Sequence, residues 1–264
     1  MLLKSKEDKK MAKLNTNSNA YTIIYASVLV IIVAFLLAFV ASALKPTQDA
    51  NVELDKKSQI LAALNIREVD DVAAKYAEVV KSDPIYGADA SQGPKAQTGG
   101  FDVVNKDITP DNRPLYIAEV DGQKKLVVPV KGAGLWGGLW GYVAVNADGE
   151  TVYGTYFSHE SETAGLGARI AEKWFQESFN GKKIFADGKV MLSVVKKGKE
   201  GNLAPENYVD GVTGATLTSN GVNDMIQECL EMYKDILSSK NGVDVASGAT
   251  PKSAGVNDMN QVNQ

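Results

Sequence analysis

The sequence predicts an α+β protein with a single N-terminal transmembrane helix, followed by an exported domain that has a mostly antiparallel sheet and flanking helices. Three observations carry this prediction. Residues 21–44 are almost wholly apolar. Residues 114–159 hold two pairs of strand-like segments, each pair joined by an Asp-Gly turn signal. Residues 222–237 repeat apolar side chains at the spacing of one helix face.

The apolar segment is long enough to cross a bilayer, because about 20 residues of helix span the hydrocarbon core. Five of the first 13 residues are lysines and two are acidic, whereas only Lys45 follows the segment closely. This lysine bias places the N-terminus in the cytoplasm and the bulk of the chain in the periplasm, as a single-pass protein of the inner membrane. A cleaved signal peptide is the competing interpretation, since residues 41–43 (ASA) resemble a cleavage site. Signal peptides usually have an apolar region of only about 7–15 residues, which favours the uncleaved anchor.

We therefore expect five parts in the chain. They are a cytoplasmic tail (1–20), the transmembrane helix (21–44), a helical lead and linker (45–100), the α+β domain (101–238) and a flexible C-terminal tail (239–264), which is rich in Ser, Gly, Asn and Gln.

The composition excludes several classes of function. The net charge is −4 and no basic stripe is present, so we expect no nucleic-acid partner. The single cysteine, Cys229, and the single histidine, His159, rule out an intramolecular disulfide and the usual Cys- or His-based metal sites, and no carboxylate spacing suggests a metal. Any redox chemistry in this chain is therefore expected to belong to an organic cofactor.

The helical lead is predicted over residues 51–82. Ile60, Leu61 and Leu64 share one face, and apolar residues between 72 and 80 form a second stripe at helical spacing. Asp55 and Asp70 are expected N-caps. Residues 91–100 are rich in Gly, Ser and Gln and are expected to form a loop.

Strands and further helices are predicted in the domain that follows. Segments 114–120 and 124–130 flank Asp121-Gly122, and segments 140–146 and 151–159 flank Asp148-Gly149. We expect a helix over 170–179 and a strand over 189–196. The last helix carries its apolar residues on one stripe, which includes Cys229.

The segment 210–220 (DGVTGATLTSN) differs from its surroundings. It combines two glycines and an alanine with four hydroxyl residues, directly before the last helix, which Thr218 or Ser219 is expected to cap. Free N–H groups and the positive end of the helix dipole favour a phosphate there, and the glycines allow it to approach the main chain. From spacing alone, a glycine-rich turn before a capped helix remains an open alternative.

Residues 210–216 (DGVTGAT) resemble the flavinylation motif of FMN-binding-domain proteins. The resemblance implies that a flavin transferase joins the phosphate of FMN covalently to the hydroxyl of Thr216. It also implies that the rest of the motif supports this attachment, namely Asp210, Gly211, Thr213, Gly214 and Ala215. Asp210 is expected to position the loop or to serve the transferase reaction.

Further segments follow in the order of one branch of that family, the NqrC flavoproteins of the Na⁺-translocating NADH:quinone reductases. They are 131–137 (KGAGLWG), 162–167 (ETAGLG), 181–185 (GKKIF) and 217–221 (LTSNG). The resemblance implies an electron-relay subunit of a respiratory, sodium-transporting oxidoreductase. NADH oxidation, ubiquinone reduction and ion translocation then belong to partner subunits, because no dinucleotide-binding fingerprint is present here. Ala164 stands where the family usually has proline.

Other flavin contacts are expected from the same resemblance. In the loop 162–167, the polar atoms of Glu162 and Thr163 and the N–H groups near Gly165 and Gly167 are expected to bond the ring edge, and Leu166 is expected to cover its face; a simple helix-entry turn is the alternative. Trp136, Lys196, Leu217 and Thr218 are further candidates. Trp140 and His159 are more typical of a packing residue and a surface residue, respectively.

Two other functions remain open from the sequence. One is the corresponding flavoprotein of an Rnf-type ferredoxin:NAD⁺ reductase, which the LWG and LTSNG segments disfavour. The other is a membrane-anchored binding module without redox activity.

Overall fold

The computed structural model describes residues 18–238, so most of the expected tail 1–20 and the whole of the expected tail 239–264 lie outside the described residues. The chain divides into two units, Met1–Glu53 and Leu54–Gln264. The domain boundaries expected from the sequence differ from this division and stay predictions.

The helix α1 spans Asn19–Ala63 and contains the expected transmembrane segment. Its most apolar 18-residue window has a mean hydropathy of 3.1 and no buried residues, so this helix is long and apolar enough to cross a membrane. The helix continues through Pro46 to Ala63. One expectation about this region was wrong. Asp55 therefore lies inside the helix, where it accepts a hydrogen bond from Gln59, and is no N-cap.

The helical lead predicted over 51–82 is not continuous, because its residues up to Ala63 belong to α1. Asn65 and Glu68 have positive φ and separate α1 from α2, which spans Val72–Val79. Its N-cap is Asp71, not Asp70, since the Asp71 carboxylate accepts a hydrogen bond of 2.9 Å from the Ala74 N–H. The chain then enters β1 (Val80–Ser82), because its N–H and C=O groups pair with β5 instead of extending the helix.

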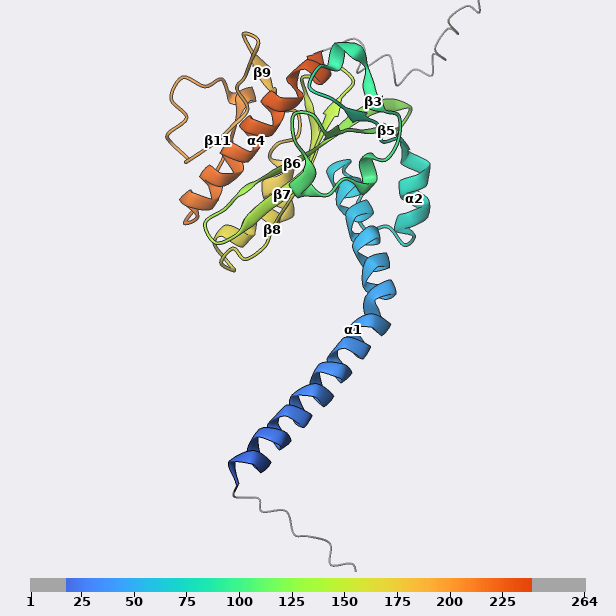
Figure 1. The fold of residues 1–264 in the computed structure, drawn as a ribbon. Helices are drawn as coiled ribbons and strands as arrows, with labels where there is room; N and C mark the ends of the chain where they lie inside the picture. The colour runs from blue at the N-terminus through green and yellow to red at the C-terminus, as the bar shows by residue number, and fades with distance from the viewer. Residues whose placement is uncertain (1–17, 239–264) are drawn as a thin grey trace, which may run out of the picture. The chain divides into compact units, whose positions relative to one another are not determined.

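A five-stranded antiparallel sheet forms the centre of the domain. Its strands are β1, β5 (Tyr116–Val120), β6 (Gln123–Ala133), β7 (Gly138–Asn146) and β8 (Val152–His159), and they lie in the order β1-β5-β6-β7-β8 (Figure 1). The expected hairpins are confirmed. Asp121 and Gly122 both have positive φ, as a two-residue type I′ turn requires. The β7–β8 connection is longer, and only Gly149 in it has positive φ.

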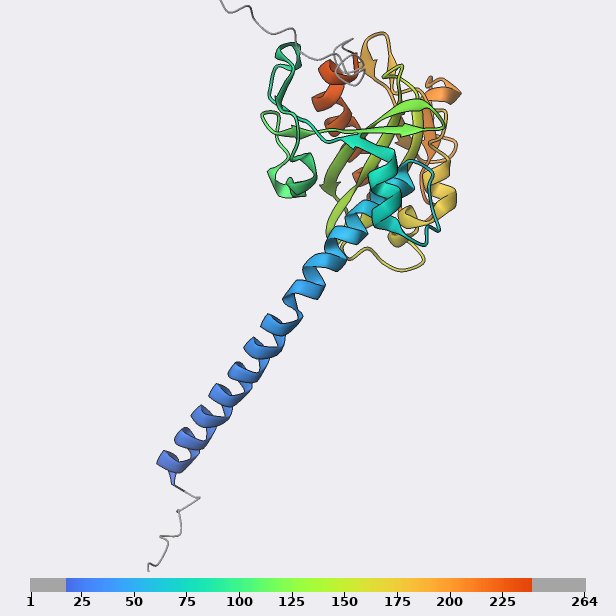
Figure 2. The same cartoon turned by 90° about the vertical axis from the view of Figure 1, so that its right-hand side faces the viewer.

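Each face of the sheet carries its own hydrophobic core. One core joins sheet residues such as Val128 and Val143 to the helix α4 (Thr216–Ser238). The other joins Val127 and Ala144 to residues 60–64 and to α2. Figures 1 and 2 show α4 along one face of the sheet and α2 on the other. Every apolar residue that the spacing of the last helix assigned to its buried stripe is buried, Cys229 included.

The chain between β1 and β5 folds into short elements. They are β2 (Ile85–Tyr86), η1 (Ala90–Gln92), β3 (Pro94–Ala96), η2 (Gly100–Asp102), η3 (Asn105–Asp107) and β4 (Arg113–Pro114). The expected loop 91–100 is therefore only partly irregular, because β3 pairs with β2.

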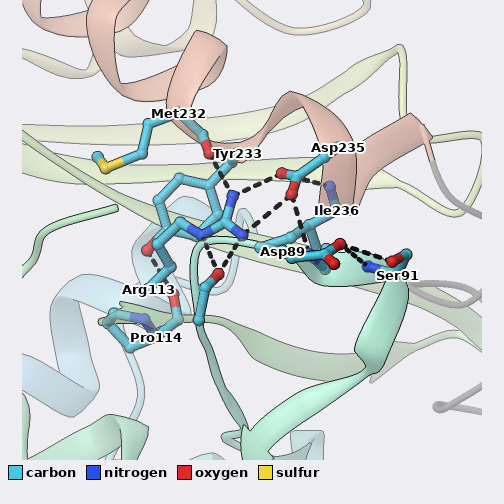
Figure 3. Close-up of polar contacts among 10 residues, drawn as sticks. Asp89, Ser91, Arg113, Pro114, Met232, Tyr233, Asp235 and Ile236 are labelled. Atoms are coloured by element: carbon cyan, nitrogen blue, oxygen red, sulfur yellow. Dashed lines mark hydrogen bonds and ion pairs between the residues drawn. The ribbon is translucent and has the colours of Figure 1, made fainter. Parts of the chain in front are cut away.

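Arg113 fastens this region to the last helix. Its side chain is 3% exposed, and the guanidinium donates to the carbonyl oxygens of Gly87 and Met232 and to both carboxylate oxygens of Asp235 (Figure 3). The Ala90 N–H donates to the same carboxylate at 3.2 Å. Every nitrogen of the guanidinium therefore has an acceptor, as a buried arginine requires.

The segment after β8 contains less regular structure than predicted. In place of a helix over 170–179, the turn η4 (Gly167–Ala171) precedes a single helical turn, α3 (Lys173–Glu177). The strand predicted over 189–196 is divided into β10 (Lys189–Val190), which pairs with β9 (Phe185–Ala186), and β11 (Ser193–Val195). After the turn η5 (Pro205–Asn207), β12 (Tyr208–Asp210) pairs with β11 in parallel and leads directly to the candidate motif.

Candidate functional site

The motif loop is a tight connection between β12 and α4. The Gly211 N–H donates to the Val195 carbonyl at 2.7 Å and so extends the β11–β12 pairing by one residue. A turn follows in which the Ala215 N–H donates to the Val212 carbonyl at 3.0 Å. Gly214, the third residue of this turn, has φ +83°, which an L-residue rarely adopts. Glycine is therefore required at this position for a conformational reason.

The helix α4 begins at Thr216. Thr218 and Ser219 therefore lie inside the helix, and the prediction that one of them caps it was wrong. The first helical bond joins the Ser219 N–H to the Ala215 carbonyl at 2.9 Å. The N–H groups of Thr216, Leu217 and Thr218 consequently have no acceptor within the helix. The Ser219 hydroxyl instead accepts a hydrogen bond of 3.0 Å from the Val212 N–H, which holds the loop against the helix.

A hollow of about 360 Å³ opens beside the start of α4. Its lining residues are Lys196, Lys197, Gly211, Val212, Thr213, Gly214, Thr216, Ser219 and Asn220. Thr216 and both lysines are exposed, and within residues 18–238 no carboxylate lies at ion-pair distance from either lysine. The hollow thus combines a free hydroxyl, the positive end of a helix dipole and two cations, which suits an anionic ligand.

The loop 162–167 lies against the motif. The Leu166 N–H donates to the Thr163 carbonyl at 3.1 Å, and Gly165 between them has φ +76°, the arrangement of a type II turn. A Cβ atom added to Gly214 would lie 3.2 Å from Leu166 Cδ2, so the two loops touch. Leu166 is 44% exposed, and Thr163 and Gly165 are also exposed.

Glu162 occupies a different environment from the rest of its loop. Only 6% exposed, it accepts hydrogen bonds from the Thr218 hydroxyl at 2.5 Å and from the Trp136 N–H at 2.8 Å. Burial alone would raise the pKa of this carboxyl, but these bonds and one from the Leu135 N–H outweigh it and hold the pKa below its ordinary value. Glu162 is therefore ionised at neutral pH.

The other residues that the sequence analysis considered as contacts do not line the hollow beside Thr216. The Trp136 side chain is 65% exposed, and only its backbone N–H takes part, through Glu162. Trp140 lies within β7. His159 accepts a hydrogen bond from the Glu162 N–H at 3.2 Å, so it supports the loop and is not merely a surface residue. The Asp210 side chain is exposed, whereas its backbone pairs with Val195.

The structure therefore brings five of the predicted residues together in the lining of one hollow, and a sixth, Leu166, touches Gly214. The five are Lys196, Gly211, Thr213, Gly214 and Thr216. The sequence analysis assigned no role at the site to three other residues of this lining, Lys197, Val212 and Asn220. No motif distinguished Lys197 from the other lysines of its loop, and only its position next to Lys196 offered a signal.

Comparison with known proteins gives consistent matches. A model of the FMN-binding domain family matches residues 134–231. The NqrC protein of the Na⁺-translocating NADH-quinone reductase from Haemophilus ducreyi is 34% identical over 235 residues, which cover 81% of this chain and 90% of that protein. The NqrC protein from Vibrio anguillarum is 31% identical over 228 residues, covering 79% and 89%.

A solved structure agrees with these relatives. The crystal structure of NqrC of the Na⁺-translocating NADH-quinone reductase from Parabacteroides distasonis has 40% sequence identity and a TM-score of 0.68. The match covers 74% of this chain and 98% of that one.

Proposed function

This chain belongs to the NqrC family of the Na⁺-translocating NADH-quinone reductases, and from that premise we propose that it carries FMN covalently on Thr216 and relays electrons within the complex. The observation that carries the proposal is the placement of Thr216. This residue is exposed and is the first of α4, and it lines a hollow that is also lined by two lysines.

The residues present fit a flavin phosphate. Gly214 lets the main chain turn sharply beside Thr216, and the N–H groups of the first helical turn provide donors for phosphate oxygens. Lys196 and Lys197 would balance the remaining negative charge. Leu166 and Leu217, both exposed at this site, offer apolar surface for a ring system.

Attachment requires an activated donor, because an alcohol and a phosphate monoester do not condense spontaneously in water. We therefore assign the donor to a flavin dinucleotide used by a flavin transferase. The Thr216 Oγ–H bond and the pyrophosphate bond of the donor break, the Oγ–P bond forms, and the nucleoside monophosphate leaves with the proton. No oxidation or reduction accompanies this step.

Once bound, FMN supplies the capacity to accept and donate electrons. The chain contributes retention and orientation. A covalent tether on Thr216 keeps the cofactor at a high effective concentration beside the loop 162–167. This would matter on the periplasmic side of the inner membrane, where the lysine bias of the N-terminus predicts that the domain lies. The other subunits of the complex would deliver and remove the electrons.

A denaturing gel viewed under ultraviolet light tests the attachment. The full chain, produced together with a flavin transferase, is expected to give a fluorescent band. T216V removes the hydroxyl at nearly constant volume and is expected to abolish the band, whereas T216S keeps an acceptor hydroxyl and is expected to retain it. Thr216 is exposed, so both variants should fold normally. A fluorescent T216V band would show that Thr216 is not the attachment site.

A further inference from the structure

Three segments that are distant in the sequence meet at the carboxylate of Glu162. One oxygen accepts from the Trp136 N–H in the β6–β7 connection, and the other accepts from the Thr218 hydroxyl in the first turn of α4. Thr218 is 2% exposed and lies two residues after Thr216. The carboxylate thus links the attachment helix to the loop that carries Leu166.

Two glycines leave the space that this carboxylate fills. A Cβ atom on Gly134 would collide with Glu162 Oε1. A Cβ atom on Gly167 would lie 2.5 Å from both Glu162 Oε2 and Thr218 Oγ1. Because real Cβ contacts are longer than this, neither position accepts a larger residue while the carboxylate stays in place.

Neither member of the pair lines the hollow beside Thr216, and both side chains are buried. The Glu162 oxygens are also already engaged by the protein's own donors. The pair is therefore placed to hold neighbouring segments of the protein together and not to contact a ligand.

Resting on the proposed attachment at Thr216, we propose that Glu162 and Thr218 form a positioning pair that holds the loop 162–167 over the attached flavin, through hydrogen-bond geometry and not through charge. Leu166 is the residue whose position this pair controls, since its side chain touches the attachment turn at Gly214. The pair governs how the flavin is covered and not whether it is attached.

The choice of variants separates geometry from charge. In E162Q the amide oxygen still accepts from the Trp136 N–H, and the amide nitrogen donates to the Thr218 hydroxyl, which accepts as well as donates. E162M has a similar length and replaces the carboxylate by a thioether, whose sulfur is only a weak acceptor. T218V removes the hydroxyl at nearly constant volume, whereas T218S keeps it. E160M serves as a matched control, because Glu160 is an exposed carboxylate in the same connection that accepts only at 3.2 Å from the Gly138 N–H.

The experiment measures iodide quenching of flavin fluorescence and the flavin midpoint potential in the full chain, after flavin attachment and well below the melting temperature of each variant. E162M and T218V are expected to stay labelled at Thr216 but to expose the flavin. Losing one hydrogen bond, with or without a charge on the acceptor, raises the loosened population about two- to tenfold. The double variant E162M/T218V should be no more exposed than E162M, because T218V removes only a contact that E162M has already broken, whereas E162M also removes the acceptor of the Trp136 N–H.

E162Q, T218S and E160M are expected to match the wild type. If E162Q exposes the flavin as much as E162M does, charge and not geometry is responsible, and the inference is wrong. Wild-type quenching and potential in both E162M and T218V would also overturn it; T218V alone decides if E162M fails to fold. A wild-type chain without flavin on Thr216 would instead refute the proposed function itself.

Discussion

Substituting Gly167 with alanine should damage the site by collision and not by backbone strain. Gly167 does not have the positive φ that disfavours alanine, but its new Cβ atom would lie 2.5 Å from both Glu162 Oε2 and Thr218 Oγ1. The three atoms cannot all stay in place. The hydrogen bond between Glu162 and Thr218 therefore has to open, or the loop 162–167 has to move away from α4.

The expected cost follows from these contacts. Forcing a methyl group into a packed site costs about 1–3 kcal/mol. A hydrogen bond to a charged group contributes about 1.5–3 kcal/mol. Because the loop can relieve part of the clash by giving up part of the bond, we expect a net loss of about 3 kcal/mol in the free energy of unfolding.

Thermal unfolding of the full chain in detergent, followed by tryptophan fluorescence, measures this loss. A change of about 3 kcal/mol should lower the melting temperature by roughly 6–12 °C for a domain of this size. Gly188 provides the control. It has φ +68° and open space around its Cβ position, so G188A should cost only about 1 kcal/mol through backbone strain. Equal losses in G167A and G188A would refute the close packing of Gly167 against Glu162 and Thr218.

Three further predictions follow from other parts of the domain. Burial alone would raise the pKa of the Asp235 carboxyl, but its hydrogen bonds and its charge interaction with Arg113 lower this pKa overall. The ionised carboxylate therefore stabilises the fold above the pKa of the unfolded state, and this stabilisation is lost as the pH falls through the pKa of the folded state. The stability difference between wild type and D235N, measured by urea unfolding, should accordingly shrink below about pH 4, and a difference that grows there would contradict this. Ala164 occupies the second position of a type II turn, where proline is favoured. A164P should therefore stabilise the domain by about 0.4–1 kcal/mol in urea unfolding, and destabilisation would exclude that turn geometry. The buried Tyr86 hydroxyl has no hydrogen-bond partner within the described residues, so Y86F should leave the melting temperature unchanged or raise it, and a clear decrease would reveal a partner.

The elements with strong local signals were predictable from the sequence. Alternating residues and Asp-Gly pairs identified the hairpins β5–β6 and β7–β8, because a type I′ turn such as that at Asp121-Gly122 demands these residue types. Helical spacing identified the buried stripe of α4, because one face of a long helix must pack against the sheet. The residues near Thr216 were predictable because they are neighbours in the sequence.

The elements and contacts that could not be predicted from the sequence depend on long-range contacts. The start of α4 was misplaced because hydroxyl residues favour N-caps, whereas Ser219 uses its hydroxyl to bind the Val212 N–H across the loop. The short segments between β8 and α4 lack periodicity, and their strands form only by pairing with one another. Glu162 was identified as a site residue, but its bond to Thr218, 56 residues away, has no sequence signature.

Peptide mapping by mass spectrometry tests the central claim most directly. The protein is to be purified from cells that contain a flavin transferase and digested, and the peptide with Thr216 is to be sequenced by fragmentation. We predict that this peptide carries one FMN moiety and that fragmentation assigns it to the Thr216 side chain. An unmodified peptide, or a flavin located on another residue, would contradict the account.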